Sequence, residues 1–409
     1  MKLSTAWNWQ LGIGILEDNV FGQSNPVAST PQIDLLIEKR CEPRISLSLP
    51  IRYRKKGKKL SWFVAQSVDV SRNGVRLALD HEVDVGTQID LDIKLPEIEN
   101  TVRLEGVIVW ANPSNNSPAM IECGVAFKNL RQLSNRDKIM YFMADKICSL
   151  AERNSKNFHC RPARTLEDMR RAYELVYREY LRKGYCEANP SKMHYSYYSL
   201  LPDSRTFMLE KAGNFAGTVS LIPDSESGLP LDSIFGKEIA LFRSQGRTLA
   251  EVGLLALDGE SFEKSSFSLT DFQKLTGSFR LFKTMFDYAR SFGVTDLIIG
   301  MHPKHRELYR YLHFDAVGPV RSYPGARGKP ALLMRMDVQQ AVRTTVTHHG
   351  VGSYFLTGSI DAEELARHFF WNKETVYDFT VNEKGLLPSL SEAQIEHLKS
   401  CYPGLILPS

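Results

Sequence analysis

Residues 64–79 read VAQSVDVSRNGVRLAL, and this stretch decides the fold of the N-terminal half. Apolar and polar side chains alternate through Val64–Val70 and again through Val75–Leu79, which is typical of strands that are buried on one face. The dipeptide Asn73-Gly74 between the two runs is a turn signal. The stretch therefore predicts two neighbouring strands, with the chain turning back on itself between them.

The same pattern extends to both sides of this turn. Alternating runs recur at Ile89–Leu95 and Val102–Trp110, with turn signals at Val85-Gly86 and within residues 112–118. From about residue 47 to 127 the chain consists of short, closely spaced strands, which predicts a small barrel or sandwich.

Two short motifs lie before and within this region: RxxxR at Arg40 and Arg44, and DxSxxG at Asp69, Ser71 and Gly74. Two arginines in an extended segment present planar guanidinium groups that suit phosphate and the acceptor edge of guanine. The Asp69 carboxylate can accept hydrogen bonds from guanine, Ser71 adds a hydroxyl, and Gly74 allows a tight turn beside a flat ligand. The two motifs together favour a guanine nucleotide site.

With these motifs, residues 38–150 resemble the PilZ family of cyclic di-GMP receptors, and Gly106–Trp110 and Cys123–Phe127 add to the resemblance. The resemblance implies a six-stranded antiparallel β-barrel and a cyclic di-GMP site formed by the five motif residues. Lys39 stands where many members have a further arginine, which leaves affinity and stoichiometry open. One alternative is a decayed barrel kept as a spacer. Another is nucleic-acid binding by Arg52–Lys59, although such a cluster is more often a solvated hairpin.

Composition and charge narrow the class of protein. The 409 residues predict two or three domains, and 43% hydrophobic with 24% charged residues excludes a disordered or collagen-like chain. No apolar run reaches the roughly 18–20 residues of a transmembrane helix, and Leu11–Leu16 is too short for a secretory signal. A net charge of +4 favours a local anion site over a nucleic-acid surface. The cysteines are scattered along the chain, which favours reduced thiols in a cytoplasmic protein. His348-His349 lacks the pattern of further ligands that a metal site needs, so we expect no metal site.

After about His159 the pattern changes to α/β. Thr165 with Asp168 resembles a capping box ahead of a helix, and Ser268 with Asp271 opens a long helix that ends at Gly293. The other elements expected here are strands at Thr206–Glu210, Ala216–Pro223, Leu249–Leu257, Asp296–Gly300 and Ala331–Val338, a short helix at Lys304–His313, and tail helices after Ser359 and from Ser391 with Gln394.

This order of elements resembles the acyl-CoA N-acyltransferase fold. Residues 217–224, 228–232, 246–256 and 302–309 resemble the FeeM-type long-chain N-acyl amino acid synthases, relatives of the acyl-homoserine lactone synthases. The resemblance implies transfer of an acyl group from acyl carrier protein to the amine of an amino acid or similar small amine, with no cofactor required. Residues 258–270 hold one glycine and two glutamates, which is a poor cradle for coenzyme A and disfavours an acetyl-CoA-dependent acetyltransferase.

Several residues of this half are candidates for the reaction. Glu251 is the expected catalytic residue, because a carboxylate there can orient or deprotonate the incoming ammonium, and the alternative is a salt bridge with Arg247 or Arg243. The expected substrate-binding residues are Arg247 (for a substrate carboxylate), Tyr177, His302, His305 and Tyr309. Core packing is the alternative for the tyrosines, and a solvated loop position is the alternative for the histidines.

We expect a loose leader over residues 1–35, a barrel over 36–134, a connecting helix over 135–158, an acyltransferase domain over 159–338 and a helical extension over 339–409. The expected function is a cyclic di-GMP-binding acyltransferase. The alternative class is a cyclic di-GMP-responsive interaction module with an inert acyltransferase fold, and an open cleft at Glu251 and Arg247 beside splayed strands would speak against it. The acceptor, the acyl chain length, the oligomeric state and the direction of regulation stay open.

Overall fold

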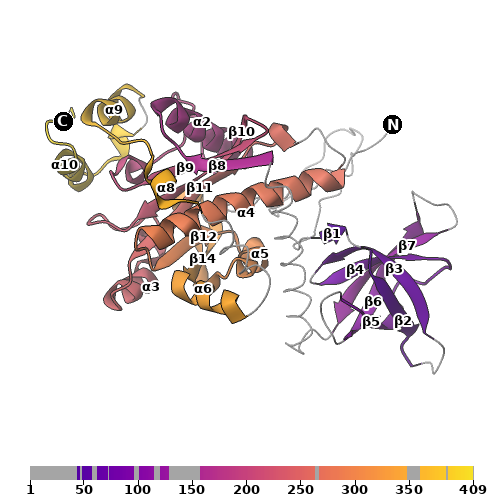
Figure 1. The fold of residues 1–409 in the computed structure, drawn as a ribbon. Coiled ribbons are helices and arrows are strands. Elements are labelled where there is room, and N and C mark those ends of the chain that lie inside the picture. The colour runs from indigo at the N-terminus through magenta and orange to yellow at the C-terminus, as the bar shows by residue number, and fades with distance from the viewer. Residues whose placement is uncertain are drawn as a thin grey trace, which may run out of the picture. The chain divides into compact units, whose positions relative to one another are not determined.

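The expected turn is present in the computed structural model, where strand β3 (Phe63–Ser71) leads into β4 (Gly74–Leu79) (Figure 1). The structure describes residues 44–46, 48–57, 62–71, 73–95, 101–114, 120–128, 157–262, 267–347, 360–383 and 386–408. These residues fall into two units, a first within 44–128 and a second within 157–344 and 360–408. The expected leader, most of the expected connecting helix, Arg40 and His348-His349 lie outside the described residues.

Six antiparallel strands of the first unit close into a barrel. Their order is β3-β2-β5-β6-β7-β4, and β4 pairs in turn with β3, which confirms the predicted six-stranded barrel. The other strands are β1 (Arg44–Ser46), β2 (Pro50–Lys55), β5 (Gln88–Ile93), β6 (Val102–Pro113) and β7 (Ile121–Lys128). β1 lies outside the closed ring and pairs with the end of β3. In β4 the predicted alternation holds, because Val75, Leu77 and Leu79 are buried in the barrel core. In β3 it is wrong for most of the strand, because Val64 is 69% exposed whereas the polar Ser67 and Asp69 are buried.

The second unit is built on a seven-stranded sheet with the order β13-β14-β12-β11-β10-β9-β8. Its strands are β8 (Phe158–Pro162), β9 (Arg205–Lys211), β10 (Asn214–Pro223), β11 (Leu249–Leu257), β12 (Asp296–Met301), β13 (Asp315–Tyr323) and β14 (Lys329–Asp337). Among the described strands only β11 and β12 are parallel, and their ladder joins Leu249–Glu251 to Asp296–Ile298. Both strands continue beyond this short ladder, so their pairing stops immediately after Glu251.

Helices cover both faces of this sheet (Figure 1). They are α2 (Leu166–Arg182), α3 (Asp232–Ser244), α4 (Phe267–Ser291), α5 (Arg306–Tyr311) and α6 (Val338–Thr347), with short turns η2 (Tyr197–Leu200), η3 (Glu260–Phe262), η4 (Pro303–His305) and η5 (Pro324–Ala326). Met208 of β9 packs in the cluster of α2, whereas its neighbour Phe207 contacts Tyr288 of α4. Alternate residues of a strand point to opposite faces, so α2 and α4 cover opposite faces. Tyr309 of α5 contacts Phe282 and lies on the α4 face.

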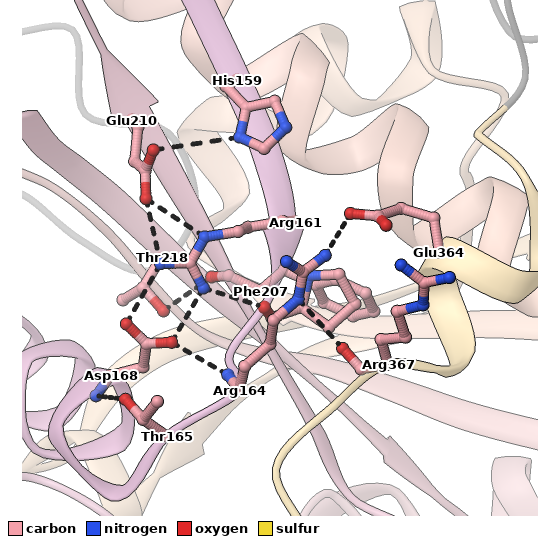
Figure 2. Close-up of polar contacts among 11 residues, drawn as sticks. His159, Arg161, Arg164, Thr165, Asp168, Phe207, Glu210, Thr218, Glu364 and Arg367 are labelled. Atoms are coloured by element: carbon pink, nitrogen blue, oxygen red, sulfur yellow. Dashed lines mark hydrogen bonds and ion pairs between the residues drawn. The ribbon is translucent and has the colours of Figure 1, made fainter. Parts of the chain in front are cut away.

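Polar contacts tie the start of α2 to the edge of the sheet (Figure 2). Thr165 begins the helix as predicted, and its Oγ1 accepts the N–H of Asp168 at 3.0 Å. The Asp168 carboxylate accepts hydrogen bonds from Arg161 of β8 (2.8 Å) and from the N–H of Arg164 (2.9 Å). Arg161 also donates to Glu210 of β9 at 3.1 Å. One partly buried arginine therefore joins the helix start to two neighbouring strands.

Residues 360–383 and 386–408, which we call the C-terminal segment, pack mainly on the α2 side of the second unit, whereas at their start the N–H of Ile360 donates to Asp287 of α4 at 3.1 Å. The segment contains α8 (Ala362–Ala366), α9 (Lys373–Tyr377) and α10 (Glu392–Cys401), with turns at Asp378–Asn382 and Leu387–Ser389. Its Phe379 and Leu398 are fully buried in one cluster with Tyr173 of α2. The N–H of Phe369 donates to the carbonyl of Ala163 at 2.7 Å. The segment is therefore part of the core of this unit.

Candidate functional site

The DxSxxG motif forms the turn between β3 and β4. Asp69 is buried, and its Oδ2 lies 2.8 Å from Nε of Arg76 on β4. The Ser71 hydroxyl donates to the carbonyl oxygen of Gly74 at 3.1 Å. A Cβ atom at Gly74 would lie 2.4 Å from the carbonyl oxygen of Val125, so the barrel itself requires glycine there. The motif thus holds the turn together and places a carboxylate and a hydroxyl on it.

Strand β1 brings the RxxxR motif to the same turn. In the antiparallel ladder Arg44 pairs with Ser71, and Ser46 pairs with Asp69. Paired residues have Cα atoms about 5 Å apart, so the Arg44 backbone lies directly beside the second motif. The side chain of Arg44 and all of Arg40 lie outside the described residues. Two motifs that are distant in the sequence are therefore neighbours on the backbone.

In the second unit, Glu251 is the last residue of β11 that pairs with β12. Its side chain is 5% exposed, and its Oε2 accepts the N–H of Leu231 at 2.9 Å. Burial raises the pKa of Glu251 to about 8, the Leu231 hydrogen bond opposes the rise, and the charge of Asp232 adds to it. A carboxyl with this pKa can take up or release a proton near neutral pH.

The two arginines considered as partners of Glu251 are engaged elsewhere. Arg247 binds Asp296 and also donates to Asp337, with 2.7 Å between Nη2 and Oδ2. Arg243 binds two carboxylates of the loop before α3 and of α3 itself. Within the described residues Glu251 forms no ion pair with either arginine, so the salt-bridge alternative is not realised there. The guanidinium of Arg247 is held at the start of β12 and the end of β14.

Beyond Glu251, β11 is irregular on its other side as well. Its pairing with β10 shifts between Gly253 and Ala256, which is a β-bulge, and Leu254 within the bulge has a φ of +51°. A leucine in this left-handed region is strained, and bulges and strained residues are concentrated near active sites. The bulge and the end of the ladder between β11 and β12 therefore both lie next to the buried carboxyl of Glu251.

A small pocket lies at this end of the two strands. It is lined by Gly300–His302 at the end of β12, by Tyr185, and by Tyr323 with residues of η5 and β14. Tyr323 also packs in the cluster of Tyr180 on α2. Burial raises the pKa of Tyr323, and the charge of Glu251 adds to the rise. Tyr323 thus connects the pocket to the catalytic candidate.

Buried polar atoms without a hydrogen-bond partner gather around this pocket. Within the described residues they are Tyr180 Oη, Tyr185 Oη, Tyr309 Oη and His305 Nε2. Burial, and then the phenols of Tyr323, Tyr185 and Tyr309, raise the pKa of Tyr180. Tyr180 comes from the α2 face and Tyr309 from the α4 face, so the two approach each other where the sheet is unpaired. Buried polar groups are rarely left without partners, and this group indicates a site for a polar ligand.

Four further residues were expected to bind substrate, and His302 is the one of them that lines the pocket. His302 lines the pocket, and its Nδ1 accepts the N–H of Lys304 at 3.2 Å. Burial lowers the pKa of His305 to about 3, so its imidazole is neutral at physiological pH. Tyr309 is fully buried, and its ring packs edge-on against Phe282 and Phe314. Tyr177 is half-buried on α2. Their roles stay predictions.

Sequence reasoning missed two tyrosines that line this pocket, Tyr185 and Tyr323, and Tyr180, which packs against them. Tyr180 lies on the apolar face of a helix, where a tyrosine indicates core packing. Tyr185 belongs to no motif, and Tyr323 lies on a strand with little apolar alternation. The described part of the chain contains no group of three metal-ligating side chains, and none of its helices has the length and apolarity needed to cross a membrane.

Two family models match the chain, in the order in which its two units occur. Residues 38–144 match the PilZ domain, and residues 171–337 match the N-acyl amino acid synthase FeeM. The first range contains the RxxxR and DxSxxG motifs, and the second contains Glu251 and the residues that line the pocket. No curated protein matches the chain.

Three solved structures illustrate the similarity. FeeM, an N-acyl amino acid synthase from uncultured soil microbes, is 27% identical over 45% of this chain and 93% of its own, with a TM-score of 0.38. The AHL synthase LasI is 12% identical over 47% of this chain and 95% of its own, with a TM-score of 0.34. The PilZ domain with c-di-GMP of YcgR from Escherichia coli is 15% identical over 24% of this chain and 86% of its own, with a TM-score of 0.20.

Proposed function

The chain contains a PilZ domain followed by a domain of the FeeM N-acyl amino acid synthase type, and on this premise we propose that it is a cyclic di-GMP-binding N-acyltransferase. It moves a long acyl chain from the thioester of acyl carrier protein to the amine of an amino acid or a similar small amine. The observation that carries this proposal is the buried Glu251 carboxyl, which lies where β11 and β12 stop pairing.

The proposed reaction is the aminolysis of a thioester. The amine nitrogen bonds to the carbonyl carbon, the carbon–sulfur bond breaks, and the thiolate leaves and takes a proton. An amino acid carries an ammonium group near neutral pH, so one proton must be removed before the nitrogen can attack. The ionised form of Glu251 accepts that proton in our proposal, because a pKa of about 8 leaves part of the carboxyl ionised near neutral pH and suits proton exchange with an amine, and Leu231 fixes one of its oxygens.

The pocket supports a donor that carries several hydrogen-bonding groups. A phosphopantetheine arm has two amides and a hydroxyl, and Tyr180, Tyr185 and His305 offer buried polar atoms that lack partners within the described residues. After β11 the chain continues with Asp258, which binds Arg178 at 2.8 Å, and with the acidic Glu260. The glutamates and the single glycine of residues 258–270 disfavour the pyrophosphate of free coenzyme A and favour a donor held by a carrier protein.

Turnover with two donors tests the enzyme activity. We expect the wild type to form an N-acyl product, identified by mass spectrometry, faster from long-chain acyl carrier protein than from the matching acyl-CoA. Glu251→Gln keeps the size of the side chain and an acceptor for Leu231, and should lower the rate on the order of 10²-fold or more. The control is Glu226→Gln, at an exposed position near Leu231, which should behave as the wild type.

The outcome that contradicts this proposal is a protein that binds cyclic di-GMP but forms no product from either donor. That result would favour the interaction module over the enzyme.

We assign cyclic di-GMP to the edge of the barrel where β1 meets the β3–β4 turn. Arg40 and Arg44 would bind phosphate and guanine, and Asp69 and Ser71 would bind the guanine edge. The proposal is supported by the ladder that sets Arg44 opposite Ser71 and by the family match over both motifs.

A further inference from the structure

The loop between β10 and α3, residues 224–231, carries the N–H group that binds Glu251. One side of the loop is held by Arg243, which donates to Asp224 (2.6 Å) and to Asp232 (2.5 Å) at the loop's two ends. Gly228 within the loop has a φ of +72°, and a Cβ there would lie 2.5 Å from an oxygen of Asp232. This side of the loop is therefore fixed by the domain that contains it.

The other side of the loop is held by the C-terminal segment. The Ser227 hydroxyl lies 2.8 Å from Nδ1 of His397 and 2.7 Å from the hydroxyl of Tyr197, and Tyr197 also hydrogen-bonds with His397. Ser227 and His397 are 170 positions apart in the chain. Three side chains from the loop, from η2 and from α10 thus form one small hydrogen-bonded cluster.

His397 is well placed to hold the loop because α10 is itself anchored. Ser391 and Gln394 form a reciprocal capping box at the start of the helix. The next residue after His397, Leu398, is fully buried, and the hydroxyl of Tyr402 donates to the carbonyl of Leu200 at 2.5 Å. The imidazole therefore stands on a fixed support, and Ser227 is positioned by it.

The cluster continues to the catalytic candidate through Tyr198. Its hydroxyl donates to the carbonyl of Ser227 at 3.5 Å, and burial with the added charge of Glu251 raises the pKa of Tyr198. Tyr198 also packs against the apolar cluster that contains Leu231. His397, the loop and the carboxyl are therefore parts of one contiguous arrangement.

We propose that His397 is a positioning residue for Glu251. By holding Ser227 it fixes the loop, so that the Leu231 N–H stays aimed at the carboxyl and the acceptor side of the site keeps its shape. The C-terminal segment, which lies outside the matched FeeM region, thus completes the active site. This inference rests on the proposed function, and it adds a residue that neither family match contains.

Steady-state kinetics with His397→Phe, His397→Asn and His368→Phe test the proposal. Phenylalanine removes Nδ1 and keeps the ring, whereas the asparagine amide places a polar atom near the position of Nδ1. We expect His397→Phe to lower kcat/KM for the acceptor roughly 5–10-fold, which corresponds to one lost hydrogen bond, with KM for acyl carrier protein unchanged. His397→Asn should restore much of the loss. His368→Phe should match the wild type, because His368 lies on the same segment and its contacts are with its neighbours in the chain, the carbonyls of Ala366 and Phe369 and the ring of Phe370.

Wild-type constants in His397→Phe, or a loss that asparagine does not restore, would overturn the proposal. A second measurement needs no activity. Thermal unfolding of His397→Phe, Glu251→Gln and the double variant at pH 7 should show coupling between the two substitutions, and strictly additive shifts would also overturn it. An inactive wild type would refute the proposed function, and the unfolding cycle would still decide the role of His397.

Discussion

Glu251 keeps its proton in the folded protein over a pH range in which an ordinary glutamate has lost it. Its pKa is raised from 4.5 to about 8. Between these values the unfolded chain releases the proton and the folded chain retains it, so the unfolded state is favoured increasingly as pH rises. The contribution of this one group to stability should therefore decline by about 1.4 kcal/mol per pH unit from roughly pH 4.5 to 8.

The first prediction follows for Glu251→Gln. Glutamine does not ionise, so the variant should gain stability relative to the wild type as pH rises from 5 to 8. Urea unfolding at several pH values would show the difference, and Glu226→Gln, an exposed position, should run parallel to the wild type. Parallel curves for Glu251→Gln would mean that the carboxyl ionises in the folded protein at its ordinary pKa.

The second prediction concerns the nucleotide motif. Arg40→Ala and Arg44→Ala should each abolish measurable cyclic di-GMP binding in titration calorimetry, because the charge-assisted hydrogen bonds of RxxxR are lost. Unfolding of the barrel should shift by no more than about 0.5 kcal/mol. The control is Arg52→Ala on β2, an arginine whose side chain is 56% exposed and bound to Asp92, and it should bind normally. Unchanged affinity in both motif variants would remove the site from this edge.

Some of the residues to which we assign a function could be predicted from the sequence and others could not. Asp69 and Glu251 are recognisable because their side-chain chemistry and their place on a strand both point to a role. The N–H of Leu231 contributes through the backbone, which carries no residue signature. His397 acts across a contact between distant parts of the chain, and no local pattern encodes such a contact.

At the scale of elements, the C-terminal segment should behave as part of the core. Phe379 is fully buried, and its ring packs edge-on against the rings of Tyr195 and Trp371, with centroid distances of 5.2 Å and 5.1 Å. Phe379→Ala should cost about 3–5 kcal/mol of unfolding free energy, because a large cavity is left. The matched control is Phe370→Ala in the same segment, whose side chain is 69% exposed and should cost little. Chemical denaturation of both variants measures the difference, and equal small effects would show that the segment is only loosely attached.

Helices that begin with a capping side chain were predicted well. The Ser391 and Gln394 pair begins α10, and Thr165 begins α2, because a capping side chain marks the first free N–H groups of a helix. β8, β13 and α3 were not predicted. β13 is an edge strand whose side chains are mostly exposed, so burial imposes no alternation on it. α3 begins after Leu231, which provides no capping side chain.

At the scale of the whole molecule, we expect cyclic di-GMP to change the rate of acyl transfer. A ligand shifts an equilibrium only if it binds one arrangement better than another, and coupling in proteins is typically ~1–3 kcal/mol, or roughly 5–150-fold. Initial rates with and without saturating nucleotide, for the wild type and for Asp69→Asn, should differ only for the wild type. Equal rates in all four conditions, with binding to the wild type confirmed, would mean that two independent functions share one chain.

The close approach of Gly74 to Val125 bears on how such receptors are recognised in genomes. The barrel demands this glycine whether or not a nucleotide ever binds, and the Ser71 hydroxyl closes the same turn. The glycine of DxSxxG therefore indicates only that a barrel of this kind is present, and says little about ligand binding. Arg44 stands on β1, outside the closed ring, so the barrel can lose it at little cost. A sequence search that gives every motif residue the same weight will count barrels that no longer bind nucleotide as receptors. A search that gives more weight to the two arginines will separate the two kinds of barrel.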